Sequence, residues 1–167
     1  AAASAQPAAP VDLSDMTGRY VLEERIGSGG MGEVWAAHDR QLDRRVALKF
    51  LHVRDEAVAS RLLDEARAQA RIDHPRIRKV YEVGKLDGRP YIAMQLLSGE
   101  TLAKAATRLS FAERLRLLVE ATTALSVAHQ AGLLHLDLKP ANLFVEWDST
   151  RPQIWIMDFG LARRAGQ

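Results

Sequence analysis

The feature that most constrains this chain is the stretch at residues 134–142, Leu-His-Leu-Asp-Leu-Lys-Pro-Ala-Asn. It places Asp137, Lys139 and Asn142 within six positions of one another. Pro140 lacks a backbone N–H and disfavours helical backbone at the residue before it, so an α-helix cannot run through the stretch. We therefore expect the three polar side chains to be held on a loop.

A second polar group follows at a short distance. Apolar runs at 132–134 and 143–145 flank the first stretch and are predicted to be short strands. Asp158-Phe159-Gly160 comes directly after another apolar run, residues 154–157. Carboxylate and amide oxygens on two loops, each next to a buried strand, suit Mg²⁺, which takes oxygen ligands and substrate phosphates.

A glycine-rich stretch lies near the start of the chain. Residues 27–34 follow a predicted strand at 20–26 and match the pattern G-x-G-x-x-G-x-V. Glycines let a backbone approach phosphates closely and present N–H groups to them. In dinucleotide-binding folds such glycines open a helix, whereas here residues 34–37 continue as a strand. The pattern favours a strand–loop–strand flap over phosphates, with a plain glycine-rich hairpin turn as the alternative.

Composition sets bounds on the function. The chain has 167 residues, of which 47% are hydrophobic and 26% charged, which is typical of a soluble globular domain. It has no cysteine, so disulfides and thiolate metal sites are excluded. A net charge of +2 gives no argument for a nucleic-acid partner, and no apolar run is as long as a membrane span.

The two ends also carry expectations. Residues 1–17 are rich in Ala and Pro and are predicted to be a disordered linker rather than a signal peptide. The chain starts without Met and stops seven residues after Gly160. We therefore expect a fragment, cut at both ends, of a longer protein.

Taken together, these motifs resemble those of the eukaryotic-like (Hanks-type) serine/threonine protein kinases, and among them most of all the bacterial members. Six separated motifs stand in the family's order between residues 18 and 163. The resemblance implies an α+β, protein-kinase-like fold. Residues 18–97 would form a small lobe of antiparallel sheet with one helix, ending in the hinge, and 98–167 the beginning of a mainly helical C-terminal lobe.

The resemblance also implies site residues, with ATP and Mg²⁺ as cofactors and protein hydroxyls as acceptors. Asp137 would accept the proton of the hydroxyl, and Lys139 would touch the γ-phosphate and mark Ser/Thr specificity. Asn142 and Asp158 would hold Mg²⁺. The family's phosphate-holding lysine and its carboxylate partner correspond to Lys49 and Glu65. The implied ATP-binding residues are Ile26, Gly27, Ser28, Gly29, Gly30, Gly32, Val34, Ala47, Lys49, Met94, Gln95, Leu97 and Phe144.

The carboxylate partner of Lys49 has a rival in the sequence. Residues 55–72 are predicted to form a helix with Leu62, Ala66, Gln69 and Ile72 along one face. Glu65 lies close to that face, and Asp64 is the alternative. The His-Pro pair at 74–75 fixes the alignment with the family and favours Glu65.

Three positions depart from the family pattern. The resemblance implies apolar residues at Gln69 and Arg78, so both could loosen the small lobe, because burying an amide without a partner costs about 1–3 kcal/mol. It implies an Arg at Leu136, directly before the catalytic Asp. Without that cation, we expect no activation through a phosphorylated segment docked there, and constitutive activity or control by another domain instead.

Further elements follow from the pattern. Residues 79–83 and 91–97 are predicted to form a hairpin, and 99–108 a short helix. Ser110 and Glu113 form a capping box that opens a long helix ending near Gly132. The expected apolar stripe of that helix is Phe111, Leu115, Leu118, Thr122, Leu125 and His129.

A function without catalysis is the alternative to an active kinase. A pseudokinase, or a module that binds nucleotide or a partner, would need no proton acceptor. We expect the fragment alone to be inactive, because the resemblance assigns peptide binding to segments after Gly160. We also expect a cytoplasmic location, with any membrane anchor supplied by segments outside this chain.

Overall fold

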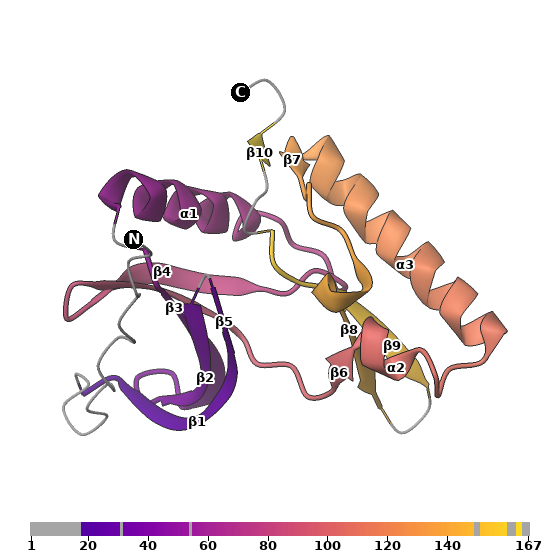
Figure 1. The fold of residues 1–167 in the computed structure, drawn as a ribbon, viewed down its shortest axis with the longest axis horizontal. Helices are drawn as coiled ribbons and strands as arrows, with labels where there is room; N and C mark the ends of the chain where they lie inside the picture. Colours follow the sequence, from indigo (N-terminus) through magenta and orange to yellow (C-terminus); the bar gives the residue numbers. More distant parts are fainter. Residues whose placement is uncertain (1–17, 31, 54, 149–150, 160–162, 165–167) are drawn as a thin grey trace, which may run out of the picture.

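The computed structural model describes residues 18–30, 32–53, 55–148, 151–159 and 163–164, and these form two lobes side by side (Figure 1). The predicted linker 1–17 and Gly160 lie outside the described residues. The elements are β1 (Tyr20–Gly29), β2 (Gly32–Asp39), β3 (Arg44–Leu51), α1 (Glu56–Gln69), β4 (Val80–Leu86), β5 (Arg89–Gln95), β6 (Glu100–Thr101), α2 (Leu102–Ala105), α3 (Phe111–Gln130), β7 (Leu133–Leu134), β8 (Leu143–Trp147), β9 (Pro152–Ile156) and β10 (Arg163–Arg164).

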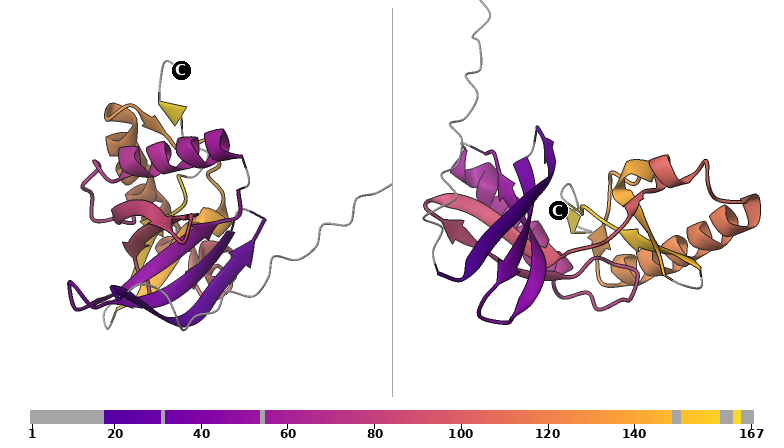
Figure 2. Two further views of the ribbon diagram at one scale, coloured as in Figure 1. Left: turned by 90° about the vertical axis from the view of Figure 1, so that its left-hand side faces the viewer. Right: turned by 90° about the horizontal axis from the view of Figure 1, so that it is seen from below.

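The first lobe is an antiparallel sheet of five strands in the order β1-β2-β3-β5-β4. Strand β3 lies at its centre and is buried on both faces, because its side chains alternate between two cores. Val46, Leu48 and Phe50 join one hydrophobic cluster, while Ala47 and Leu51 join a second cluster beneath α1. Figure 2 shows α1 against that single face of the curved sheet.

The helix α1 follows from local chemistry at its start. Asp55 is the N-cap, and its carboxylate accepts hydrogen bonds from the backbone N–H groups of Ala57 and Val58. The helix begins as predicted but ends at Gln69, three residues before Ile72. Ile72 is buried in the core of the second lobe instead, where tertiary packing overrides the helical pattern.

The hairpin of β4 and β5 is longer than predicted. Its turn consists of two residues, Asp87 at φ 47° and Gly88 at φ 75°. Positive φ at both positions gives the tight turn that Asp-Gly favours, so both strands run up to it. The predicted helix at 99–108 is also shorter than expected, because Glu100 and Thr101 pair with β8 and only Leu102–Ala105 is α-helical.

The second lobe packs α3 and α2 around a small sheet in the order β6-β8-β9. Ser110 and Glu113 make the predicted capping box at the start of α3. Of the predicted apolar stripe, Leu125 packs against the core of this lobe, whereas Phe111, Leu115 and Leu118 are 75%, 54% and 46% exposed. The side chains that α3 buries are Leu117, Ala121, Ala124 and Ala128. The prediction followed the largest apolar residues, whereas alanines let the helix approach the strands closely.

Segment 72–78 joins the two lobes. Ile77 forms a β-bridge with Ile156, and both belong to the core of the second lobe. The backbone N–H of Arg78 donates to the carbonyl of Ile156 at 3.0 Å. The start of β4 is therefore fixed directly to the strand that precedes Asp158.

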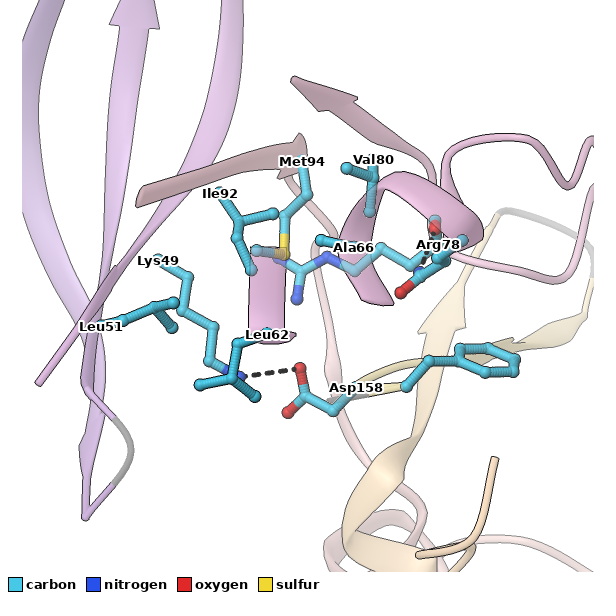
Figure 3. Close-up of a pocket in the computed structure, with 11 residues that line it drawn as sticks. Lys49, Leu51, Leu62, Ala66, Arg78, Val80, Ile92, Met94 and Asp158 are labelled. Atoms are coloured by element: carbon cyan, nitrogen blue, oxygen red, sulfur yellow. Dashed lines mark hydrogen bonds and ion pairs between the residues drawn. The ribbon is translucent and has the colours of Figure 1, made fainter. Parts of the chain in front are cut away.

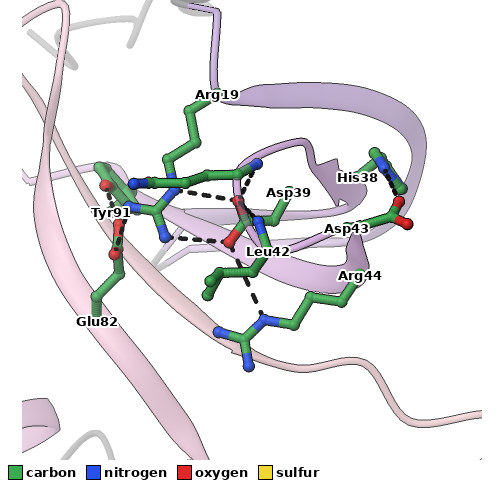
Figure 4. A network of polar contacts seen from close by, with 9 residues as sticks. Arg19, His38, Asp39, Leu42, Asp43, Arg44, Glu82 and Tyr91 are labelled. Atoms are coloured by element: carbon green, nitrogen blue, oxygen red, sulfur yellow. Dashed lines mark hydrogen bonds and ion pairs between the residues drawn. The ribbon is translucent and has the colours of Figure 1, made fainter.

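A network of polar side chains in the first lobe connects strands of its sheet (Figure 4). The fully buried carboxylate of Asp39 accepts two hydrogen bonds from Arg19, at 3.1 and 3.0 Å. Arg19 also donates to Glu82 at 2.8 Å, and Glu82 accepts from the hydroxyl of Tyr91 at 2.6 Å. Burial and the bond to Glu82 raise the pKa of Tyr91 to about 12. The network ties the residue before β1 to β2, β4 and β5.

Within the described residues, no helix is long and apolar enough to span a membrane.

Candidate active site

The loop after β7 brings its three polar side chains together. Lys139 Nζ lies 2.8 Å from Oδ2 of Asp137, and Asn142 Nδ2 donates to the Oδ2 atom at 3.1 Å and to the backbone carbonyl of Asp137 at 2.8 Å. Lys139 and then Asn142 hold the pKa of Asp137 below its ordinary value. Pro140 opens a single 3₁₀ turn, Pro140–Asn142, and Lys139 before it is extended, as predicted from the proline.

His135 and Asn142 tie this loop to the one that carries Asp158. Nδ1 of His135 accepts from the backbone N–H of Asp137 at 3.3 Å, and Nε2 lies 2.9 Å from the carbonyl of Met157. These partners assign the proton of the neutral ring to Nε2. The N–H of Met157 in turn donates to the carbonyl of Asn142 at 2.9 Å. The two polar loops therefore form one unit.

Lys49 spans the space between the lobes. Its Nζ lies 3.3 Å from Oδ1 of Asp158, and its side chain is only 15% exposed (Figure 3). Asp158 has φ 51°, a left-handed conformation uncommon for a residue with a side chain. Strand β3 and the loop after β9 thus contribute opposite charges to one place.

Glu65 lies on α1 near this place. The ion pair shown for it is with Arg61 at 3.9 Å, while Lys49 pairs with Asp158. The Lys49–Glu65 pair implied by the resemblance therefore stays a prediction. Asp64, its rival, pairs with Arg67 and is 66% exposed, which disfavours it as the partner of a largely buried lysine.

The glycine stretch forms the predicted strand–loop–strand, with Gly27 to Gly29 at the end of β1 and Gly32 at the start of β2. Gly32 has φ +149°, and a Cβ there would lie 2.0 Å from the carbonyl oxygen of Phe50. This glycine is required by the close approach of β3. Gly29 and Gly30 have open space where a Cβ would stand.

The residues implied for the adenine site come from both lobes. Ala47 and Met94 are paired across β3 and β5, and with Val34 they belong to one apolar cluster. Gln95 ends β5, and Phe144 lies on β8 in the second lobe. The other implied residues are Ile26, which is 46% exposed on β1, Leu97, which is buried after β5, and Ser28 in the glycine stretch.

The donor set fits Mg²⁺ bound together with a nucleotide. The nitrogen of the Asn142 amide is used by Asp137, which leaves its oxygen for a cation, and Asp158 supplies a carboxylate. Among the described residues, no cluster of three or more His, Asp or Glu side chains could hold a metal by itself. One carboxylate and one amide are typical of a Mg²⁺ ion that completes its shell with phosphates and water.

A pocket lies between α1, the sheet and Asp158 (Figure 3); its empty space of about 540 Å³ includes the open solvent at its mouth. Its polar lining is Lys49, Gln69, Arg78 and Asp158, and the other seven lining side chains are apolar. We call it the Arg78 pocket.

The amide of Gln69 and the Nε of Arg78 both have hydrogen-bond partners. The expected cost of burying them without partners therefore does not arise. The amide of Gln69 donates to the carbonyl of Arg78 at 2.8 Å, and Nε of Arg78 donates to the carbonyl of Gln95 at 2.8 Å. Sequence reasoning treated both residues as defects and missed them as lining residues. The available signal was a charged residue directly after Ile77, in a segment predicted to enter a buried hairpin.

Comparison with known proteins decides the family. Residues 20–167 match the protein kinase domain family, which is most of the chain. This chain belongs to the protein kinase family. The predicted family and the α+β kinase-like fold are thereby confirmed.

Curated bacterial relatives carry the same family name. The chain is 40% identical over 159 residues to the serine/threonine-protein kinase PknA of Mycobacterium tuberculosis, covering 89% of this chain and 36% of that protein. It is 37% identical over 153 residues to the serine/threonine-protein kinase Pkn3 of Myxococcus xanthus, covering 87% of this chain and 28% of that protein. The chain thus spans about a third of the length of these relatives.

Solved structures agree with this assignment. A double mutant of the Mycobacterium tuberculosis PknI kinase domain superposes with a TM-score of 0.79 at 30% identity, covering 93% of this chain and 64% of that one. The apo form of PpkA-294 has a TM-score of 0.75 at 28% identity, covering 85% of this chain and 58% of that one.

Proposed function

We propose that the protein transfers the γ-phosphoryl group of ATP to Ser and Thr hydroxyls of proteins. The observation that carries this proposal is the Lys139–Asp137–Asn142 cluster, a carboxylate held between two donors at 2.8 and 3.1 Å on the loop after β7. Relatives named serine/threonine-protein kinases support it.

The roles are those that membership of the protein kinase family implies for these positions. Asp137 accepts a hydrogen bond from the acceptor hydroxyl and takes its proton, and Lys139 places a positive charge beside the γ-phosphate. Lys49 binds the α- and β-phosphates. Mg²⁺, when bound with the nucleotide through Asn142 and Asp158, supplies charge neutralisation on the phosphates. Catalysis is positioning and electrostatic stabilisation, because phosphoryl transfer needs little covalent chemistry from the protein.

The nucleotide site uses both lobes. The glycine stretch 27–32 covers the phosphates with backbone N–H groups. Backbone groups of the hinge, Gln95 to Leu97, bind the adenine edge. Apolar side chains of the two lobes, among them Val34, Ala47 and Phe144, enclose its faces.

The proposal concerns the natural full-length protein. Residues 1–167 alone are expected to be inactive toward protein substrates. The kinase domain acts in the cytoplasm, where ATP is found, and no role in nucleic-acid binding is proposed.

The test is transfer of labelled γ-phosphate from ATP with Mg²⁺ to a generic basic protein, followed by phosphoamino-acid analysis. We expect phosphoserine and phosphothreonine, and loss of most transfer in Lys139→Ala. The matched control is Lys104→Ala, at an exposed lysine of α2, which should retain full transfer. If the protein binds ATP but transfers nothing, it is a nucleotide-binding module without catalysis.

A further inference from the structure

Glu33 is a buried glutamate on β2, directly after the last glycine of the glycine stretch. The residue is 9% exposed, and a glutamate is almost never buried unless another group pairs with it. Its Oε1 atom accepts from Nη2 of Arg89 at 3.0 Å, and Nε2 of His52 lies 3.8 Å from the same oxygen. The proposed phosphoryl transfer gives this ion pair no role, although the pair lies beside the glycine stretch.

The ion pair lies on the face of the sheet opposite the adenine site. Glu33 is paired across β2 and β3 with Phe50, whose side chain belongs to the hydrophobic cluster on the face away from α1. The next residue, Val34, belongs to the cluster beneath α1, together with Ala47 of the implied adenine site. Successive residues of a strand point to opposite faces of the sheet. Glu33 therefore does not face the nucleotide, and any effect on nucleotide binding passes through the backbone that Glu33 holds.

The position of the glycine stretch depends on the start of β2. β1, which enters the stretch, is the edge strand of the sheet and is paired there with β2 alone. Of its 10 residues only Tyr20 is buried, and its pairing with β2 contains two register shifts, so packing holds β1 weakly. Gly32, by contrast, packs closely against the carbonyl of Phe50. The glycine stretch is thus attached to the rest of the lobe through Gly32 and Glu33.

Arg89 holds this point from the other side of β3. It is the first residue of β5 and follows the tight turn of Asp87 and Gly88 directly. Its guanidinium lies 5.3 Å from the centre of the Phe50 ring. The Glu33 side chain is only 11% exposed, so solvent and salt screen the pair less than they screen a surface pair. The contact therefore ties β2 to β5 across β3, at the end of the sheet that carries the glycine stretch.

The same strands carry Lys49. Lys49 on β3 is paired with Val34, one residue after Glu33. The glycine stretch and Lys49, both proposed to bind phosphates, are therefore on neighbouring strands, and their spacing depends on how the start of β2 lies against β3. A displacement of about 1 Å is enough to spoil such a geometry.

We propose that Glu33 and Arg89 are positioning residues, whose ion pair keeps the glycine stretch at the distance from Lys49 at which both contact the phosphates of one ATP. This inference rests on the proposed function and deepens it. It assigns to two residues outside the nucleotide site a selective effect on the binding of the phosphates and none on the binding of adenosine.

The experiment compares ATP with Mg²⁺, which carries the phosphates, and adenosine, which lacks them. Their dissociation constants for the natural full-length protein and its variants are measured by isothermal titration calorimetry. In Arg89→Met we expect ATP with Mg²⁺ to bind at least about fivefold more weakly, while the Kd of adenosine changes by less than about twofold. A merely structural role of the pair would weaken the binding of both ligands alike.

Two further variants serve as control and rescue. Arg45 forms an exposed ion pair with Glu23 in the same sheet at 2.8 Å, so Arg45→Met is the matched control and should leave both constants unchanged. Arg89→Lys keeps the charge, and the contact with Glu33 uses a single nitrogen of the arginine. ATP binding in Arg89→Lys should therefore lie within about twofold of the unaltered protein. The same selective loss in Arg45→Met, or in Arg89→Lys, would contradict the role of this ion pair.

Two results in Arg89→Met would overturn the inference: equal weakening of ATP and adenosine, and unchanged binding of both. If Arg89→Met does not fold, Glu33→Gln replaces it, since it keeps the shape of the side chain and removes the charge. A selective weakening of ATP in Glu33→Gln supports the inference, and an unchanged ratio of the two constants contradicts it.

These measurements need no phosphoryl transfer, so the two proposals fail separately. A selective loss of ATP binding in a protein that transfers no phosphate refutes the kinase proposal alone. Phosphate transfer by a protein whose two constants are unchanged in Arg89→Met refutes the positioning role alone.

Discussion

The Nζ atom of Lys49 lies 3.3 Å from Oδ1 of Asp158, although the two residues are 109 positions apart. This ion pair joins the central strand of the first lobe to the loop that follows the second lobe's sheet. The same two side chains are the groups assigned to the phosphates and to the metal. The pair neutralises both charges, so the proposed binding of a nucleotide with Mg²⁺ would exchange it for contacts with the phosphates and the cation.

Replacing the lysine tests its electrostatic role. Lys49→Met keeps a long apolar stem but removes the charge, so we expect kcat/KM to fall at least about a hundredfold. The folded state should survive, because Met suits the apolar neighbours of Lys49. Steady-state kinetics measure the first effect and thermal unfolding the second. Unchanged kcat/KM in a folded variant would show that the role of Lys49 is misassigned.

The partner of Lys49 in the nucleotide-bound state is tested by two neighbouring carboxylates. If Glu65 orients the lysine as predicted, Glu65→Gln should lower kcat/KM in the same direction as Lys49→Met but by less, because the phosphate-binding charge itself is kept. Asp64→Asn is the matched control and should have little effect, since Asp64 is exposed and pairs with Arg67. Kinetics that show the larger loss in Asp64→Asn would reverse the assignment.

Much of the fold was accessible from local pattern and turn chemistry. The proline at 140 and the capping box at Ser110 predicted a loop and a helix start, both of which the structure shows. What escaped were choices made by tertiary packing. Periodicity alone could not tell that α3 buries its alanines, or that Ile72 would leave α1 for the other core.

In the candidate site, too, some residues could be predicted from the sequence and others could not. Residue types and spacing placed Asp137, Asn142 and Asp158 on neighbouring loops. The partners of Gln69 and Arg78 could not be predicted, because they are backbone carbonyls at positions 78 and 95, and a carbonyl carries no signal in the sequence. Because of these backbone partners, the side chains of Gln69 and Arg78 are hydrogen-bonded where the sequence suggested unpaired polar groups.

Acid should destabilise the first lobe through Asp39. The guanidinium of Arg19 holds the pKa of this buried carboxyl below its usual range, with help from the N–H groups of Leu42 and Gln41. Its stabilisation is therefore complete above the unfolded pKa of about 3.9 and is lost as the pH falls through the lower folded value. At pH 7, we expect Asp39→Asn to lower the free energy of unfolding by about 1–3 kcal/mol.

Urea unfolding of both proteins from pH 7 to pH 2 measures this difference. The gap between wild type and Asp39→Asn should shrink below about pH 4. Asp87→Asn, in the exposed hairpin turn at φ 47°, is the control and should match the wild type. A gap that is the same at every pH would rule out the charge of Asp39 as its cause.

From the leucine at position 136 we predict that activity does not depend on phosphorylation of the activation segment. It stands directly before Asp137, is 59% exposed and has φ 59°. A leucine offers neither charge nor donor to a phosphate, so a phosphorylated activation segment gains no ionic pair there. We expect the initial rate of the full-length kinase to survive dephosphorylation, or replacement of each activation-segment Ser and Thr by Ala. A loss of more than about a hundredfold, equal to roughly 2.7 kcal/mol, would refute this.

The most direct test of the kinase assignment is single-turnover phosphoryl transfer by the full-length protein and by Asp137→Asn. The substitution keeps the shape of the side chain but removes the proton acceptor. We predict that transfer slows by about 10²–10⁴-fold. Affinity for ATP with Mg²⁺ should stay nearly unchanged, because Asp137 binds neither. Transfer at the wild-type rate by Asp137→Asn would contradict the account.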